Sequence, residues 1–386
     1  MDIKSLSEKH DAYIIDRRRF YHSCPEPSLK EVNTLASIKK DLIEMGITDI
    51  VEMKDCYGLY ATIHGGKPGK TVALRTDIDA LEIVEETGLP FASTNGYMHA
   101  CGHDNHIATL LGAAKILNDV KDELCGDVRL MVQPAEEVAQ GAKGMVKEGA
   151  MDGVDAIYGT HVWGDFDAPY FDFVAGNRMA CCHIFKIEVT GTSAHGSAPN
   201  LGKDAITCAA AMVNNIQQIV SRINNPLNPL VITIGKIDGG TRFNVIPNKV
   251  VMEGTVRTFS TGTEVEDEMR HIVEKTAETF KQKAVLTYDY LTMPVINDEK
   301  LANIARGAVT KLFGEGMLLD HSALMGSEDF SWFGEKAPYV FGFVGTRNEK
   351  EGKIYSNHQE KYDVDESALH KSAAVMAQFA ADFLNE

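Results

Sequence analysis

The chain has 386 residues, with 38 Lys and Arg against 55 Asp and Glu, which leaves a formal net charge of −17. Because phosphate contacts need clustered cations, this acidic balance argues against a nucleic-acid partner. No apolar run reaches about 18 residues and the first segment is charged throughout, so we expect neither a membrane span nor a signal peptide. Seven scattered cysteines then predict reduced thiols in a cytoplasmic protein.

A chain of this length predicts two domains, because one hydrophobic core rarely serves more than about 300 residues. Residues 1–50 have helical apolar spacing, and strands alternating with helices follow them, which predicts a mixed, mostly parallel sheet covered by helices. The segment GGKPGK predicts a hairpin-like turn and not a phosphate loop, whose first glycine is His64 here. The expected strands cover 59–64, 71–76, 127–133 and 155–162, and the expected helices cover 141–150 and 106–120, the latter capped by Asp104.

From residue 183 the pattern changes to β-α-β-β-α-β, which predicts a compact ferredoxin-like α+β unit. Its expected helices cover 206–223 and 264–283. After Pro294 the α/β rhythm resumes, and it closes with a helix over 365–384. We therefore predict a discontinuous larger domain over 1–182 and 294–386, with an inserted domain over 183–293.

Cys101 and His103 flank Gly102 just before a predicted helix. A thiolate and an imidazole on such a tight loop can reach one metal ion, and the glycine lets the backbone bend between them. A structural histidine beside a helix start is an equally common reading of this segment alone.

Further polar groups follow three of the predicted strands, and in open α/β sheets ligands bind at the carboxyl ends of the strands. Adjacent glutamates repel each other unless a cation offsets the repulsion, although any one of these residues could be a solvated loop residue. The pattern predicts metal-dependent hydrolysis, with one Glu as ligand and its neighbour moving the proton, and it suits Zn, Mn, Co or Ni alike. The candidates are Asp77 and Asp79 after one strand, Glu136 and Glu137 after another, His161 after a third, and His358 before the last helix.

The predicted insertion carries a second cluster of candidates, namely His195, Asn244 and Arg257. Side chains of these types donate hydrogen bonds to a developing oxyanion or to a substrate carboxylate. Taken alone, each residue of this kind is more often an ordinary loop or surface residue.

Six segments in this order resemble the M20 metallopeptidases, and most closely their amidohydrolase branch, subfamily D, with hippurate hydrolase, N-acyl-amino-acid amidohydrolases and auxin-conjugate hydrolases. The similarity runs from about Arg18 to the C-terminal helix and implies a zinc-exopeptidase-like fold with an inserted dimerisation domain. The segments are RTDIDAL (75–81), MHACGHDNH (98–106), QPAEE (133–137), GTHVW (159–163), GGTRFNVIPNK (239–249) and GSEDFSWF (326–333).

The resemblance implies a homodimer with two divalent metal ions per subunit, which cleaves a small N-acyl amino acid into a carboxylic acid and an amino acid. Glu136 would be the general base, Asp79 would orient a ligand, and His195 would reach the active site of the partner subunit. Asn244 and Arg257 match positions that contact substrate. The implied metal ligands are Cys101, His103, Glu137, His161 and His358.

Four residues depart from the usual branch pattern, namely Pro27, Asn105, His183 and Asn200. None removes an implied ligand, but the loops around 95–105 and 195–200 are expected to border the substrate, so the specificity for acyl group and amino acid stays open. A dipeptidase or aminopeptidase of the same family is the first alternative. A non-catalytic binding protein that kept the fold is the second.

Overall fold

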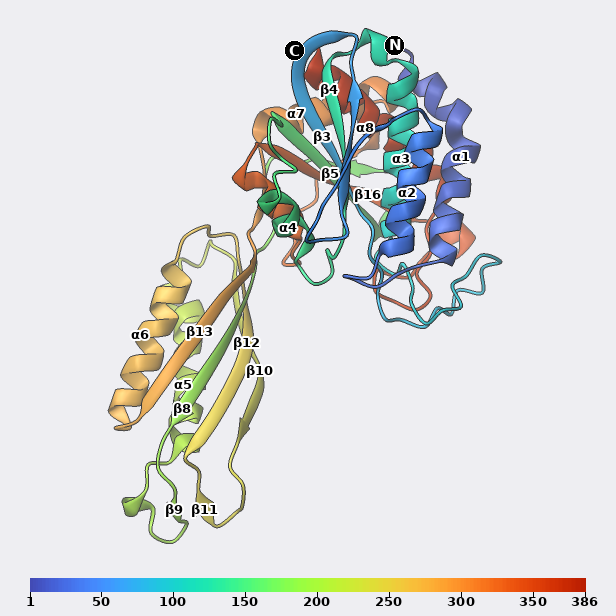
Figure 1. Ribbon diagram of the computed structural model, residues 1–386. Helices are drawn as coiled ribbons and strands as arrows, with labels where there is room; N and C mark the ends of the chain where they lie inside the picture. Colours follow the sequence, from blue (N-terminus) through green and yellow to red (C-terminus); the bar gives the residue numbers. More distant parts are fainter. The chain divides into compact units, whose positions relative to one another are not determined.

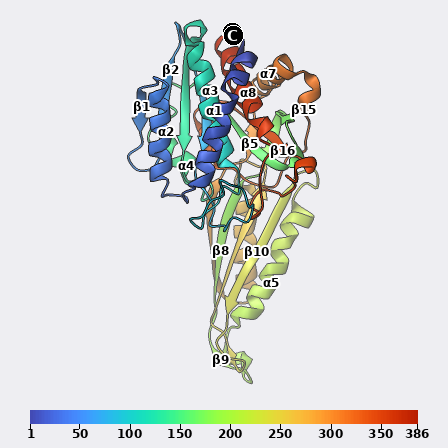
Figure 2. The same ribbon diagram turned by 90° about the vertical axis from the view of Figure 1, so that its right-hand side faces the viewer.

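The computed structural model describes residues 1–386, which divide into two compact units (Figures 1 and 2). Unit 1 comprises Met1–Arg178, Ile296–Ser322 and Asp329–Glu386, and unit 2 comprises Met179–Val295 and Ala323–Glu328. The segment 323–328 was predicted to lie in the larger domain, but the structure places it in unit 2. The segment belongs to unit 2 because Leu324 bridges Met179 and because Ser327 accepts a 2.6 Å hydrogen bond from Arg257.

Unit 1 is built on an eight-stranded mixed sheet of order β1-β2-β4-β3-β5-β16-β6-β15. Its four central strands, β4, β3, β5 and β16, run parallel, which confirms the predicted fold class. The strands are β1 (Asp49–Glu52), β2 (Leu59–His64), β3 (Lys67–Asp77), β4 (Cys125–Gln133), β5 (Ala156–Asp167), β6 (Phe171–Asp172), β15 (Leu318–Leu319) and β16 (Tyr339–Arg347).

The predicted hairpin-like turn after β2 is wrong. Strands β2 and β3 are not neighbours, because β4 lies between them, antiparallel to β2 and parallel to β3. Strand β3 begins inside the glycine-rich segment, where Lys67 pairs with Cys125. A Cβ at Gly69 would lie 2.2 Å from the carbonyl oxygen of Cys125, so the glycine permits this close pairing with β4.

Five helices of unit 1, namely α1, α2, α3, α7 and α8, share one hydrophobic core with the sheet. Figure 1 shows where these helices lie along the sheet. Each apolar stripe buries its Leu, Ile, Val and Ala side chains, and α3 and α8 are buried along almost their whole length. The final helix starts four residues later than expected, after a 3₁₀ turn over Glu366–Ala368. The helices are α1 (Ile3–Ser23), α2 (Val32–Glu44), α3 (His103–Asp119), α4 (Gly141–Lys147), α7 (Glu299–Phe313) and α8 (Leu369–Leu384).

Asp104 does not cap α3, contrary to the prediction. The helix begins at His103, with Gly102 at the N-cap, so Asp104 is already its second residue. Its buried carboxylate accepts hydrogen bonds from Arg18 Nε at 2.9 Å and from His22 Nδ1 at 2.8 Å. The side chain therefore ties α1 to the start of α3, because a charged partner on a neighbouring helix outweighs a local capping bond.

Unit 2 is a four-stranded antiparallel sheet of order β10-β12-β8-β13, with α5 and α6 packed into its core. Along the chain, β8, β10, β12 and β13 are the first, second, third and fourth strands. Read across the sheet from β13, their order is therefore 4-1-3-2, as expected for a ferredoxin-like unit. The helix predicted over 206–223 is α-helical only to Gln218 and ends in a π turn. The elements are β8 (Cys182–Thr190), α5 (Ala205–Gln218), β10 (Leu230–Gly239), β12 (Lys249–Thr258), α6 (Glu264–Thr279) and β13 (Lys283–Thr292).

Two short pairs of strands complete the chain. Strand β9 (Ala194–His195) pairs with β11 (Val245–Ile246) at one end of unit 2. Strand β7 (Gly176–Met179) pairs with β14 (Val295–Asn297), and these two strands lie at two of the four places where the chain passes between units. No helix combines the length and apolar character that a membrane crossing needs.

The parallel register brings the predicted polar groups of unit 1 to one sheet edge. Asp77, the last residue of β3, pairs with Gln133, the last residue of β4. Strand β3 also pairs Leu74 with Tyr158 of β5, so Asp77 and His161 each lie three residues beyond a paired position. The loops after β3 and β4 therefore begin beside His161, as the sequence predicts.

Candidate metal centre

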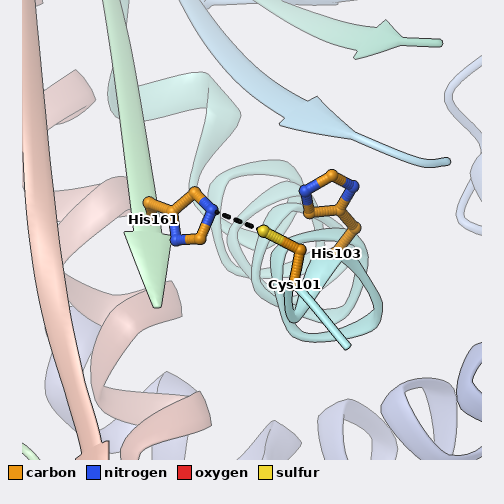
Figure 3. A group of neighbouring side chains, drawn as sticks. All are labelled: Cys101, His103 and His161. Atoms are coloured by element: carbon orange, nitrogen blue, oxygen red, sulfur yellow. Dashed lines mark hydrogen bonds between the residues drawn. The ribbon is translucent and has the colours of Figure 1, made fainter. Parts of the chain in front are cut away.

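The thiol of Cys101 lies at the centre of the polar cluster at this sheet edge. Its Sγ is 3.2 Å from Nε2 of His161 and 3.2 Å from Nε2 of His358. Figure 3 shows the thiol between the imidazoles of His103, on α3, and His161, on β5. Cys101 and His161 are buried, whereas the His358 side chain is 54 % exposed, so the cluster opens toward solvent on the side of His358.

Gly102 makes this arrangement of Cys101 and His103 possible. Its φ of 91° lies in the left-handed region, and a Cβ there would lie 2.3 Å from Val162 Cγ2. Only glycine meets both conditions without strain. The sequence expectation that the glycine lets thiol and imidazole share one centre therefore has a direct structural basis.

His103 presents a free ring nitrogen to the cluster. Its Nδ1 lies 2.9 Å from the carbonyl oxygen of Asp79 and 3.2 Å from Asp79 Oδ1, which assigns the proton to Nδ1. Its Nε2 is fully buried without a hydrogen-bond partner. Burial lowers the pKa of His103, but Asp77 and Asp79 outweigh that effect and raise it to about 10. A divalent cation would compete with this proton for Nε2.

His161 is held in the tautomer that a metal ligand needs. Its Nδ1 donates a 2.6 Å hydrogen bond to the carbonyl oxygen of Val162, which leaves the Nε2 lone pair directed at the Cys101 thiol. Burial, helped by the nearby His106, holds the pKa of His161 well below its usual range. The imidazole is therefore neutral, which is its metal-binding form.

The two adjacent glutamates, Glu136 and Glu137, lie beside the imidazoles of the cluster. Oε1 of Glu137 is buried without a hydrogen-bond partner, 3.8 Å from His103 Nε2 and 3.7 Å from His358 Nε2. Burial raises the pKa of Glu137 to about 7. The Glu136 carboxylate lies within 4.8 Å of the ligand atoms of both His103 and Glu137. One acid therefore faces the imidazoles, and a second lies beside it.

The backbone around the cluster is strained. Of the five non-glycine residues with positive φ, three border it, namely Ala135 at 52°, Ala139 at 54° and His358 at 68°. Each left-handed L-residue costs about 1–2 kcal/mol, and such residues concentrate at functional sites. His358 is held there by a 2.8 Å hydrogen bond from its N–H to the carbonyl oxygen of Ala100.

The donor atoms form two overlapping triads, in each of which all atoms lie within 4.8 Å of one another. The first consists of Cys101, His103 and His161, and the second of Cys101, Glu137 and His358. Burial raises the pKa of the shared thiol well above its usual value, so a cation is needed to hold it as thiolate. The orphaned Nε2 and Oε1 atoms and the sulfur, nitrogen and oxygen donor set fit a pair of borderline divalent cations.

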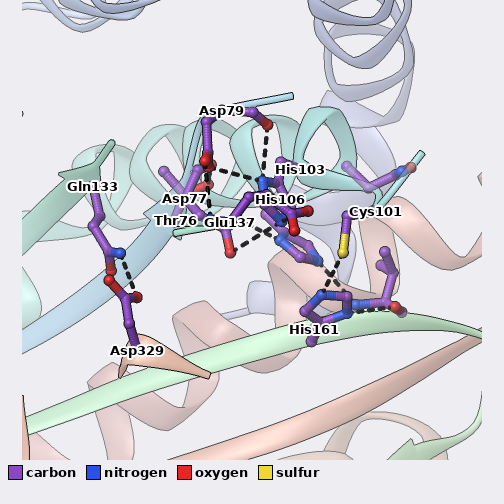
Figure 4. A network of polar contacts seen from close by, with 12 residues as sticks. Thr76, Asp77, Asp79, Cys101, His103, His106, Gln133, Glu137, His161 and Asp329 are labelled. Carbon is purple, nitrogen blue, oxygen red and sulfur yellow. Dashed lines mark hydrogen bonds and ion pairs between the residues drawn. The ribbon is translucent and has the colours of Figure 1, made fainter. Parts of the chain in front are cut away.

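Sequence reasoning missed the role of His106 and left Asp77 without one. His106 Nδ1 donates a 2.6 Å hydrogen bond to Asp77 Oδ1 (Figure 4). Its Nε2 accepts a 2.9 Å bond from the Val162 N–H. Both ring nitrogens are thus engaged, which excludes His106 as a ligand in this arrangement. The spacing of His103 and His106, three residues apart on one helix, is the signal that could have revealed the pair.

Asp77 and Asp79 hold the cluster from behind. Arg75, His103 and His106 outweigh the effect of burial and lower the pKa of Asp77 well below its usual range. The second oxygen of Asp77 lies 3.6 Å from His103 Nε2. Asp79 lies beside Nδ1 of the same ring, and its Oδ2 accepts a 3.0 Å bond from the Glu137 N–H. The two carboxylates therefore position one imidazole and one glutamate.

The three candidates in unit 2 do not form one cluster, contrary to the prediction. His195 and Asn244 do come together, since β9 pairs with β11 and the Gly196 N–H donates to the carbonyl oxygen of Asn244 at 2.9 Å. Strand β12 begins at Lys249, shortly after β11, and Arg257 lies eight residues farther along it. In an extended strand these eight residues span about 26 Å, which separates Arg257 from the β9–β11 pair. An antiparallel sheet separates residues at the two ends of a strand, and local spacing does not reveal this.

Comparison with known proteins identifies the family. Residues 73–382 match the family model of peptidase family M20/M25/M40. The chain is 39 % identical over 377 residues to an N-acetyl-L-cysteine deacetylase of Bacillus subtilis, with 96 % of this chain and 88 % of the relative covered. It is 38 % identical to thermostable carboxypeptidase 1 of Saccharolobus solfataricus, with 100 % and 98 % covered.

A solved structure agrees with these relatives. The YXEP protein of Bacillus subtilis, described as a dinuclear metal-binding peptidase of the M20 family, superimposes with a TM-score of 0.87 at 33 % identity, over 98 % of this chain and 99 % of that one. With the family model matching most of the chain and both relatives covering nearly all of it, the chain belongs to the peptidase family M20/M25/M40, within its amidohydrolase branch.

Proposed function

We propose that this enzyme hydrolyses the amide bond of N-acyl amino acids at a centre of two divalent cations. The observation that carries the proposal is the convergence of the buried Cys101 thiol with the unpartnered His103 Nε2 and Glu137 Oε1. We assign Cys101, His103 and His161 to one cation, and Cys101, Glu137 and His358 to the other. The deacetylase relative supports an N-acyl substrate.

The chemistry divides between the cations and the Glu136 carboxylate. Bound cations would polarise the amide carbonyl and lower the pKa of a water molecule. Glu136 takes a proton from that water molecule while the water oxygen bonds to the acyl carbon. Glu136 then delivers the proton to the leaving nitrogen as the C–N bond breaks. Its place beside His103 and Glu137 supports this role, and Asp79 keeps His103 and Glu137 oriented.

We further propose that three residues of unit 2 bind substrate. His195 is exposed, with Nδ1 2.7 Å from Ser197 Oγ, and Asn244 lies beside it. We assign both to the active site of the partner subunit in a homodimer formed through unit 2, where His195 would donate to the oxyanion. Arg257 would bind the substrate carboxylate.

The substitution Glu136→Gln tests the mechanism, because the amide keeps the shape of the side chain but cannot take up the proton. We expect kcat for N-acetyl- and N-benzoyl-amino acids to fall about 100- to 10,000-fold while metal content stays unchanged. The matched control is Glu44→Gln, on the exposed surface of α2, which should behave as the wild type. Undiminished hydrolysis by metal-loaded Glu136→Gln would contradict the mechanism.

A peptidase activity is the second candidate function, because the carboxypeptidase relative is 38 % identical over the whole chain. A panel that compares free-amino dipeptides with N-blocked amino acids separates the two. Faster hydrolysis of the N-blocked series supports the amidohydrolase proposal. Faster hydrolysis of dipeptides supports the alternative.

A further inference from the structure

The loop between β4 and α4, residues 134–140, carries both Glu136 and Glu137 in an unusually constrained backbone. It enters the left-handed region at Ala135 and again at Ala139. It also closes on itself so tightly that a Cβ at Gly141 would lie 1.6 Å from the carbonyl oxygen of Pro134. A strained loop of this kind keeps one conformation only where its surroundings hold it.

Carboxylates from three distant segments supply that support. All three side chains are fully buried, and each accepts a hydrogen bond from a backbone N–H in or next to the loop. Charge-assisted bonds of this kind are stronger than bonds between neutral groups. The pairs are Glu31 with Ala135 at 2.7 Å, Asp79 with Glu137 at 3.0 Å, and Asp329 with Ala142 at 3.0 Å.

Glu31 differs from the other two in having no cationic partner. Asp79 lies beside the His103 ring, and Asp329 accepts from Gln133 Nε2 at 2.6 Å and lies 3.5 Å from Arg75. A buried carboxylate without a cation is costly, so it stabilises the fold poorly by itself. Its contact with Ala135 therefore needs another explanation than stability.

The place of Glu31 in the chain strengthens this point. It is the N-cap residue of α2, yet its side chain makes no capping hydrogen bond to that helix. A Ser or Asp would cap the helix without burying a longer acid. The side chain instead extends to Ala135, 104 residues along the chain. Glu31 therefore forms a hydrogen bond with the loop that carries Glu136 and Glu137 instead of capping its own helix.

We infer that Glu31 is a positioning residue for the reaction: by holding the Ala135 N–H, it sets the direction in which the Glu136 and Glu137 carboxylates enter the cluster. This inference rests on the proposed function. Glu31 accepts from the N–H of Ala135 and Asp79 accepts from the N–H of Glu137, so the two acids fix the loop on both sides of Glu136. Loss of Glu31 frees the loop at one end, and a misplaced general base costs rate more than substrate affinity.

The experiment compares Glu31→Ala and Glu31→Gln with the matched control Glu26→Ala. Glu26 also lies at the start of α2, where its carboxylate accepts hydrogen bonds from the Thr34 N–H and hydroxyl at 2.7 and 2.9 Å, but it forms no hydrogen bond with the 134–140 loop. Three quantities are measured: deuterium exchange of the loop in metal-free protein, the visible spectrum of the Co²⁺-loaded protein, and kcat and KM for N-acetyl- and N-benzoyl-amino acids.

For Glu31→Ala we expect faster loop exchange, a shifted Co²⁺ spectrum, and a kcat lowered about 10- to 100-fold with KM nearly unchanged. Glu31→Gln keeps an oxygen acceptor and should restore most of the rate. Glu26→Ala should lower only the melting temperature. If Glu31→Ala does not fold, Glu31→Gln and Glu31→Asp, which shortens the reach to Ala135, carry the same three readouts.

The outcomes separate the inference from the function on which it rests. A Glu31→Ala variant that only melts earlier, as the control does, overturns the inference, and so does faster loop exchange with unchanged Co²⁺ spectrum and kcat. A wild-type enzyme that cleaves no N-acyl amino acid overturns the proposed function. In that case the exchange and the Co²⁺ spectrum still decide whether Glu31 positions the loop.

Discussion

The metal centre of unit 1 and the β9–β11 end of unit 2 both hold candidate active-site residues, but they are built differently. In unit 1 Cys101, His103 and His161 are buried, the Nδ1 atoms of both imidazoles are hydrogen-bonded, and His103 and Glu137 keep orphaned atoms that face one another. In unit 2 His195 is exposed on a strand of only two residues. The first region therefore brings its donors together within one chain, whereas the second leaves its candidate side chain open to solvent.

The largest effect is expected from Cys101→Ala, which removes the donor shared by both triads. Metal content should fall by about half or more, and activity about 1,000-fold or more, because each ion loses a ligand. Elemental analysis of protein purified in excess Zn²⁺ or Mn²⁺ provides the measurement. Cys56→Ala, at a half-buried cysteine of the same unit, is the control and should bind metal normally. Full metal loading of Cys101→Ala would show that the thiol is not a shared ligand.

The second prediction concerns the buried ion pairs of Asp104, which tie α1 to the start of α3. Asp104→Asn weakens two buried charge-assisted hydrogen bonds, from Arg18 and from His22, so we expect about 3 kcal/mol lower free energy of unfolding in urea. The loss is not larger because Arg18 keeps Asp363 and His22 keeps Glu85 as partners. Asp16→Asn removes an ion pair with Arg17 at a 68 % exposed carboxylate and should cost less than about 1 kcal/mol. Equal costs for the two variants would remove the contrast between buried and exposed ion pairs.

The third prediction tests whether the exposed region acts on a partner. His195→Ala should lower kcat about 100- to 1,000-fold with metal content unchanged, because one oxyanion donor is lost. Co-expression of His195→Ala with Glu136→Gln, under different affinity tags, gives mixed dimers. Action in the partner's site restores one intact site per mixed dimer. Mixed dimers no more active than either parent would place His195 in its own chain's site.

The smallest effect is a pH dependence at the edge of the buried region. Burial raises the pKa of Glu31 from 4.5 to about 7, so the folded state binds this proton more tightly than the unfolded state does. Stability is then lost as pH rises from about 4.5 to 7, by up to about 3 kcal/mol. Metal-free Glu31→Gln, which cannot ionise, should match the wild type near pH 4.5 and be more stable above pH 7.

Melting curves at several pH values measure this gap, with Glu44→Gln as the surface control, for which we expect a change within about 0.5 kcal/mol. A constant difference between Glu31→Gln and wild type across the range would show that the Glu31 charge does not limit stability. A gap that opens with pH would show that this acid is kept at the expense of stability.

Much of the architecture could be predicted from local patterns. The strand and helix spacings, the change of rhythm at residue 183 and the β-α-β-β-α-β order lead to the observed sheets. Two local interpretations failed for one reason. The turn after β2 does not form a hairpin, because β4 inserts between β2 and β3. Asp104 does not cap α3, because Arg18 and His22 lie close enough to pair with it. Both outcomes depend on segments far away in the sequence.

The candidate site divides in the same way. Residue chemistry by itself marked the thiol, the imidazoles and the paired glutamates, because ligand atoms belong to side-chain types and strand ends follow from periodicity. Only the tertiary structure decided which nitrogen of each ring is free, that His106 supports the site from behind, and that Arg257 lies far from His195. Hydrogen-bond partners and strand register arise between distant segments, and they set tautomer, orientation and distance, which no local pattern contains.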